Sequence, residues 1–198
     1  MTQGYLAKFK HGGKMSISTR SIVVAGVMIA VSIVLAVTGL GYFPVPNVTA
    51  EATIMHVPAI VGGILEGSVV GMLIGVVFGV NALARFSGLP IFVGQPVWMP
   101  FLVLFVPRLF IGVVAALSYR GLWKINELLA AAVAAVLGTL ANTVLVLGLA
   151  ILFGLLPVET IILVIPQVLF ECGAAAVITV AVVAAWKRIE IGRRGSSV

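Results

Sequence analysis

Four polar side chains lie inside stretches of sequence that are otherwise apolar: Asn81, Arg108, Asn142 and Glu171. A guanidinium, a carboxylate and two amides offer ion pairing and hydrogen bonding to a polar molecule. Counted at about 1.5 Å per residue, each lies roughly 15–20 Å from one end of its predicted helix. Such groups are costly in lipid, so we expect them to face the protein interior and form a binding site. The alternative is structural: Glu171 neutralises Arg108 and the amides connect helices.

Three further side chains are candidates for the same site. Gln167 lies one helical turn from Glu171, on the same helix face. Arg85 stands near the outer end of its predicted helix, where its side chain can reach the membrane interface. His56 lies early in a short apolar stretch, where a buried structural histidine is the alternative to a ligand contact. With His11 as the only other histidine, the sequence does not predict a metal site.

The loop 86–100 is rich in glycine and proline and is expected to act as a lid. Gln95 would give this lid a polar contact and Trp98 an apolar wall, as small-molecule sites require. The alternative for Trp98 is anchoring at the membrane interface, where tryptophan is common.

The sequence contains none of the common catalytic or nucleotide-binding motifs that we considered. The segment 12–15 (GGKM) lacks the first glycine and the hydroxyl of a phosphate-binding loop. There is no H-E-x-x-H motif, no nucleophile elbow and no acidic pair for acid–base chemistry. We therefore expect a binding protein rather than an enzyme, with no cofactor of its own.

The elements that must position these residues are membrane helices. Of 198 residues, 62% are hydrophobic and 9% are charged, so much of the apolar surface must face lipid. The sequence predicts an all-α membrane protein, whose six transmembrane helices cover about 21–41, 52–65, 68–85, 99–119, 128–155 and 158–186.

Basic residues predict the orientation of this bundle. Ten of the twelve Lys and Arg residues fall in the N-terminal segment, the turn near 120–127 and the C-terminal tail. The positive-inside rule then places both termini in the cytoplasm. We divide the chain into a basic segment 1–20, a six-helix substrate-binding domain 21–187 and a basic tail 188–198. The basic charge is explained by topology, so no nucleic-acid partner is expected.

Small residues recur every four positions in two predicted helices. Gly26 and Ala30 form one such pair in the first helix, and a longer series runs through Gly63, Gly67, Gly71, Gly75 and Gly79. This spacing permits close approach between helices. We expect internal packing for the long series, whereas docking onto another membrane subunit is a real alternative for the first helix.

Several of these segments in the same order resemble the substrate-binding S component of energy-coupling factor (ECF) vitamin transporters. They are the Gly26–Ala30 pair, the segment 52–58 (ATIMHVP), the glycine series, Pro107-Arg108 and the segment 138–147 (GTLANTVLVL). The resemblance extends over about residues 16–187. It implies a six-helix bundle that takes up a vitamin from outside, in the plasma membrane of a prokaryote. A separate membrane scaffold and two ATPase subunits would power release, and Gly26 and Ala30 would dock on that scaffold.

Within the family, segments 54–58 and 138–147 look most like the pantothenate type. Arg108 would then pair with the vitamin carboxylate, while Asn81 and Asn142 would bind its amide and hydroxyls. Riboflavin, folate, lipoate or cobalamin are alternative substrates. A stand-alone transporter that uses Glu171 as a proton carrier is the alternative from another functional class.

Overall fold

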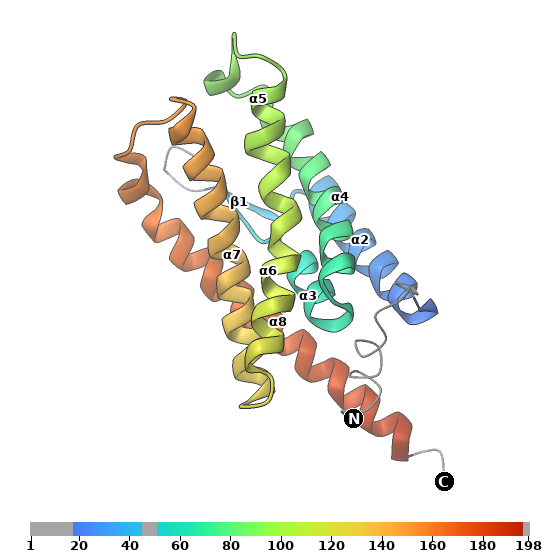
Figure 1. Cartoon of the computed structure of the whole chain (residues 1–198). Helices are drawn as coiled ribbons and strands as arrows, with labels where there is room; N and C mark the ends of the chain where they lie inside the picture. The colour runs from blue at the N-terminus through green and yellow to red at the C-terminus, as the bar shows by residue number, and fades with distance from the viewer. Residues whose placement is uncertain (1–17, 45–50, 196–198) are drawn as a thin grey trace, which may run out of the picture.

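The computed structural model describes residues 18–44 and 51–195. Within this part, five helical segments are long and apolar enough to cross a membrane. They are α2 (Thr19–Thr38), α4 (Ser68–Phe86), the segment Trp98–Leu122, α7 (Glu127–Leu152) and α8 (Thr160–Gly195), of which Thr160–Trp186 is the apolar span. They form a bundle in which the beginning of α2 and the end of α8 lie at the same end (Figure 1).

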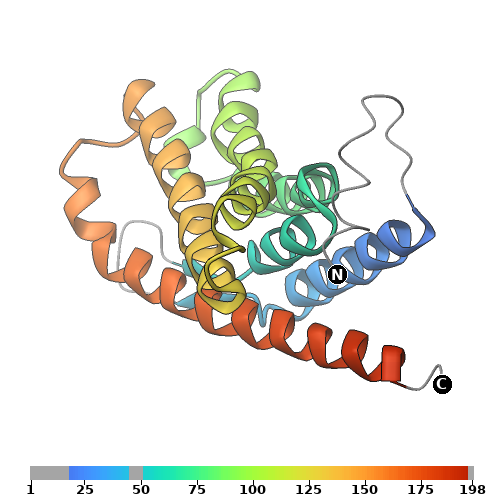
Figure 2. The same cartoon turned by 60° about the horizontal axis from the view of Figure 1, so that its bottom comes forward.

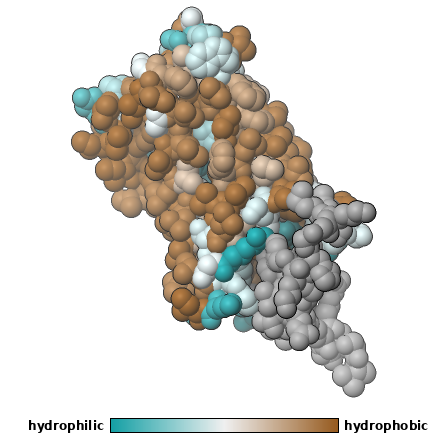
Figure 3. Space-filling view, in the orientation of Figure 1, coloured by the Kyte–Doolittle hydropathy of each residue, from teal (hydrophilic) through white to brown (hydrophobic). Residues whose placement is uncertain are grey.

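The ends of the chain are described only in part. Except for its last three residues, the basic segment predicted at 1–20 lies outside the described residues. At the other end, α8 continues to Gly195, beyond the helix end predicted at 186 and into the predicted tail. The face drawn in Figure 3 is mostly apolar, with hydrophilic residues gathered toward the two ends of the bundle, as expected for a protein surrounded by lipid.

The second predicted transmembrane helix, 52–65, is wrong in its first five residues. Instead of a helix from residue 52, β2 (Glu51–Thr53) pairs antiparallel with β1 (Tyr42–Pro44). The Thr53 hydroxyl donates to the Gly41 carbonyl and accepts from the Met55 amide, so the chain turns here rather than coiling. The expected all-α fold is therefore corrected to a helical bundle that contains one short β-hairpin.

The helix that follows, α3 (Val57–Glu66), begins five residues later than predicted. Pro58 favours this start, because proline lacks an amide hydrogen and fits the first turn of a helix. Ten residues extend about 15 Å, half of the hydrocarbon core, so α3 is too short to cross alone. The hairpin lies midway along the bundle and α3 continues toward one end, so together they occupy the place of the second crossing (Figure 1).

The fourth predicted helix is continuous from residue 98 to 122, but it is not regular. It consists of α5 (Trp98–Pro100), a π-helical turn η2 (Phe101–Phe105) and α6 (Val106–Leu122). Pro107 cannot donate a backbone hydrogen bond, which loosens the helix one turn earlier. The preceding loop contains a single 3₁₀ turn, η1 (Pro90–Phe92).

Glycines hold α4 against α6, as the four-residue spacing predicted. A methyl group on Gly71 would lie 2.8 Å from the Cα of Gly112, and one on Gly75 would lie 2.3 Å from the Arg108 carbonyl oxygen. Both distances are shorter than any tolerated carbon contact, so only glycine allows the two backbones to approach this closely. This glycine seam, defined by Gly71, Gly75 and Gly112, fixes Arg108 at the centre of the bundle.

The two outer helices are packed differently. α8 runs along one side of the bundle in contact with α7 and α3 (Figure 2). α2 contacts α3 and α4 and buries only Ser21, Val24 and Ser32. Most of α2 is thus open to lipid or to a partner.

Candidate functional site

Arg108 is buried in α6, with 7% of its surface exposed. Its Nη1 donates to the Val103 carbonyl at 3.0 Å. That carbonyl would normally accept from the amide of residue 107, but Pro107 has none, so the π-helical turn leaves it free for the arginine. The guanidinium also lies over the Phe78 ring, 5.5 Å from its centre. Its Nε has no hydrogen-bond partner.

His56 is fully buried at the beginning of α3, and its orientation is set by α7. Its Nε2 lies 2.9 Å from the hydroxyl of Thr139, which donates its single proton to the Ala135 carbonyl at 2.9 Å. The hydroxyl must therefore accept from the imidazole, and Nε2 carries the hydrogen. In the neutral ring Nδ1 is then an acceptor, and it has no partner. Thr139 lies one turn before Asn142 in α7, so this hydrogen bond places His56 near the level of Asn142.

Asn142 lies in α7 at the depth of Arg108. A methyl group on Gly138 would lie 3.3 Å from the Ile111 carbonyl oxygen, so the antiparallel α6 and α7 meet there. Arg108 lies about one turn before Ile111 in α6, and Asn142 lies about one turn after Gly138 in α7. Because the two helices are antiparallel, both residues lie at the same level of the bundle. Asn142 is 8% exposed, and its Oδ1 has no partner.

Three elements thus contribute one buried polar atom each that this chain leaves without a partner: Arg108 Nε, His56 Nδ1 and Asn142 Oδ1. Leaving such atoms unpaired costs about 1–3 kcal/mol each, and native proteins contain few of them. We call these three residues the orphan cluster. The cluster offers one donor with positive charge and two acceptors, which is a set that a polar ligand can satisfy.

Glu171 does not form the ion pair with Arg108 that the structural alternative required. Among the described residues, no carboxylate oxygen lies within ion-pair distance of the guanidinium. Glu171 instead accepts from the Thr53 amide at 2.7 Å and from Gln167 Nε2 at 3.1 Å, while Gln167 also donates to the Glu51 carbonyl. The carboxylate therefore holds the hairpin to α8 and acts on Arg108 only through space.

Arg85 and Asn81 are likewise bound to the hairpin. Arg85 forms a two-point ion pair with Glu51 and lies over the Tyr42 ring, 4.2 Å from its centre. The Tyr42 hydroxyl donates to Asn81 Oδ1. Asn81 and Arg85 thus bind the hairpin, and neither contributes one of the three unpaired atoms of the orphan cluster.

Within the described part of the chain, no hydrogen bond, ion pair or ring contact joins Gln95 or Trp98 to the orphan cluster. Gln95 is exposed, and Trp98 is half exposed and packs edge-on against Phe153, 5.5 Å between ring centres. Trp98 therefore joins the loop to the end of α7.

Gly26 and Ala30 lie on the open side of α2. Both are exposed, and a methyl group on Gly26 would meet no atom within 4 Å. The small-residue pair is thus accessible from the membrane, as docking on a partner would require.

Sequence reasoning missed four residues that organise the site: Tyr42, Glu51, Thr53 and Thr139. Three belong to the hairpin, where the sequence predicted a loop at Tyr42 and Glu51 and a helix at Thr53. The available signal was the one carboxylate in that loop, Glu51, which needs a partner beside Arg85. Thr139 could have been found as the residue one turn before Asn142.

No curated protein shows significant similarity to the chain. A family model, that of the substrate-specific component of ECF transporters, matches residues 20–187. This match includes most of every helix of the bundle and every residue of the orphan cluster. The chain therefore belongs to the ECF transporter substrate-specific component family.

Proposed function

We propose that the chain captures a small, anionic, water-soluble vitamin from outside the cell, with pantothenate favoured. It would pass the vitamin on within a complex with a membrane scaffold subunit and two ATPase subunits, which supply the energy from ATP. The orphan cluster is the observation that supports this proposal. Its three unpaired polar atoms are buried in a membrane protein that belongs to a family of substrate-specific transporter components.

The cluster defines what a ligand must carry. Arg108 Nε requires an acceptor, and a carboxylate gives the strongest hydrogen bond to it. His56 Nδ1 and Asn142 Oδ1 require donors such as hydroxyl or amide N–H groups. Pantothenate has a carboxylate, two hydroxyls and an amide N–H. Lipoate has the carboxylate but neither kind of donor, and riboflavin has no carboxylate, so both leave part of the cluster unsatisfied.

The test is a binding panel on the purified chain in detergent. Isothermal titration with pantothenate, folate, lipoate, riboflavin and cobalamin should give the tightest binding for pantothenate, with folate as the next best match. Native mass spectrometry of the chain from cells would identify a co-purified vitamin independently. Tightest binding of riboflavin or cobalamin would contradict the anionic class.

The ATP-powered mechanism is tested separately, in liposomes. The isolated chain should bind the vitamin without accumulating it, and uptake should appear only with the scaffold and ATPase subunits. A proton gradient that drives uptake by the isolated chain would contradict this mechanism and favour a stand-alone transporter that uses Glu171.

A further inference from the structure

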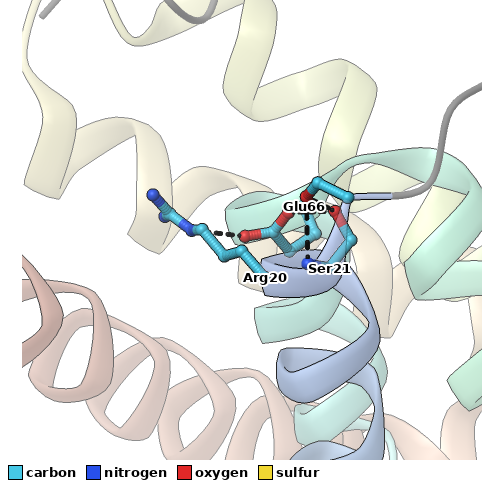
Figure 4. Close-up of polar contacts among 4 residues, drawn as sticks. Arg20, Ser21 and Glu66 are labelled. Carbon is cyan, nitrogen blue, oxygen red and sulfur yellow. Dashed lines mark hydrogen bonds and ion pairs between the residues drawn. The ribbon is translucent and has the colours of Figure 1, made fainter.

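Glu66, the last residue of α3, carries a buried carboxylate at the opposite end of the helix from His56. Its side chain is 4% exposed. One oxygen accepts from Ser21 Oγ at 2.6 Å and the other accepts from Arg20 Nε at 2.8 Å (Figure 4). Both donors are consecutive residues in the first turn of α2, so this carboxylate fixes where α2 begins.

Two further contacts strengthen this connection. Ser18 caps α2 by accepting from the Ser21 amide, and its hydroxyl lies 2.8 Å from that of Ser21. The Arg20 guanidinium lies 5.5 Å from the centre of the Trp186 ring in α8. We call Arg20, Ser21 and Glu66 the clasp. The clasp joins α2 to the turn between α3 and α4, and through Trp186 to α8.

The first half of α2 has few fully buried residues. Before Ser32 only Ser21 and Val24 are buried, while Ala25, Met28 and Ile29 are partly buried against the core. The rotation of α2 about its axis, and with it the direction that Gly26 and Ala30 face, therefore depends on the clasp together with this partial packing.

We propose that Glu66 is a positioning residue for assembly: through Arg20 and Ser21 it orients the Gly26–Ala30 face of α2 toward the membrane scaffold subunit. This rests on the proposed docking of α2. A scaffold helix that packs on small residues needs a fixed backbone orientation, because close packing tolerates little rotation. Glu66 itself is buried and does not touch the partner.

The test compares Glu66→Gln with Glu159→Gln, the same substitution at an exposed glutamate at the far end of the bundle. Each variant is co-expressed with the scaffold and ATPase subunits, and the amount of chain that co-purifies with them is measured. Glu66→Gln keeps the side-chain shape but loses the charge that pairs with Arg20. We expect at least fivefold less complex for Glu66→Gln and an unchanged amount for Glu159→Gln. Equal amounts of complex would overturn the proposal.

A distance measurement separates positioning from general damage to the fold. Spin labels at positions 27 and 137, both exposed, report the placement of α2 relative to α7 in a chain carrying Cys172→Ser. We expect Glu66→Gln to broaden or shift this distance, and Glu159→Gln to leave it unchanged. An unchanged distance in Glu66→Gln would overturn the proposal even if assembly falls.

Two more variants complete the experiment. Arg20→Gln breaks the same contact from a half-exposed side chain, so it tests the clasp if Glu66→Gln fails to fold. Gly26→Leu obstructs the docking face directly and should block assembly. If Gly26→Leu assembles normally, the proposed docking of α2 is wrong. If only Gly26→Leu blocks assembly, docking stands and the role of the clasp is wrong.

Discussion

The two ends of α3 meet buried charge in opposite ways. At one end the Glu66 carboxylate has donors for both oxygens from its own chain. At the other, His56 bonds Thr139 near the level of Asn142 and Arg108, and His56, Asn142 and Arg108 each keep one polar atom without a partner. A buried polar group with all its hydrogen bonds stabilises one arrangement of the chain. A buried group without a partner lowers the stability of the folded chain, and a ligand that bonds to it restores that stability. With the proposed function, the comparison separates residues that hold the fold from residues that would bind the substrate.

The largest expected effect is on vitamin affinity, after substitution of Arg108 in the orphan cluster. Arg108→Ala should weaken binding of the vitamin at least tenfold, or about 1.4 kcal/mol, because the carboxylate loses its positive partner. The unfolding midpoint in detergent should not fall by a comparable amount, since a buried and incompletely paired charge is removed with it. Isothermal titration and thermal unfolding measure the two quantities. Unchanged affinity would remove Arg108 from the site.

At the clasp we expect the opposite result, a loss of folding stability with little change in vitamin affinity. Glu66→Ala should lower the free energy of unfolding by about 1–2 kcal/mol, a value reduced because Arg20 is half exposed. Vitamin affinity of the folded chain should stay within about twofold, since Glu66 lies roughly 15 Å from His56 along α3. A tenfold loss of affinity would show that the two ends are not separate.

A smaller effect would sharpen the assignment of His56. Thr139→Val removes the acceptor of His56 Nε2–H, frees the ring to change tautomer and should weaken vitamin binding about three- to tenfold. Thr143→Val is the matched control, because Thr143 bonds only a backbone carbonyl one turn away. The ¹⁵N chemical shifts of His56 should report hydrogen on Nε2 in the parent chain. Hydrogen on Nδ1 would contradict the acceptor role.

The smallest effect is expected at the partly exposed ion pair of the hairpin. Glu51→Gln should change the free energy of unfolding by no more than about 1 kcal/mol and vitamin affinity by less than about threefold, because exposed pairs contribute little. Titration and unfolding again measure both. A loss of affinity as large as that of Arg108→Ala would move Glu51 and Arg85 into the binding site itself.

Much of the bundle could be predicted from local sequence. Apolar length predicted the five long helices, and glycine spacing predicted the close packing of α4, because both depend on residues near one another in the chain. Depth counting placed Arg108 and Asn142 at one level, which the Gly138 contact with Ile111 supports. These inferences required only the regular rise of a helix.

The hairpin could not be predicted in the same way. Its strands are three residues each, and they are held by Glu171, Gln167 and Arg85 from distant helices. Such tertiary contacts leave no periodic pattern in the sequence. The same contacts show where Glu171 is bound instead of pairing with Arg108, since its Oε1 accepts from both the Thr53 amide and Gln167.

The glycine seam has a consequence for movement. With backbone against backbone at Gly71 and Gly112, α4 and α6 have no side chains between them that could change rotamer to absorb a shift. The two helices must therefore move as a single rigid body that carries Arg108. If the chain binds a vitamin as we propose, we expect any opening for it to come from the elements around this body: the hairpin, the loop before α5, or the turn that joins α7 to α8.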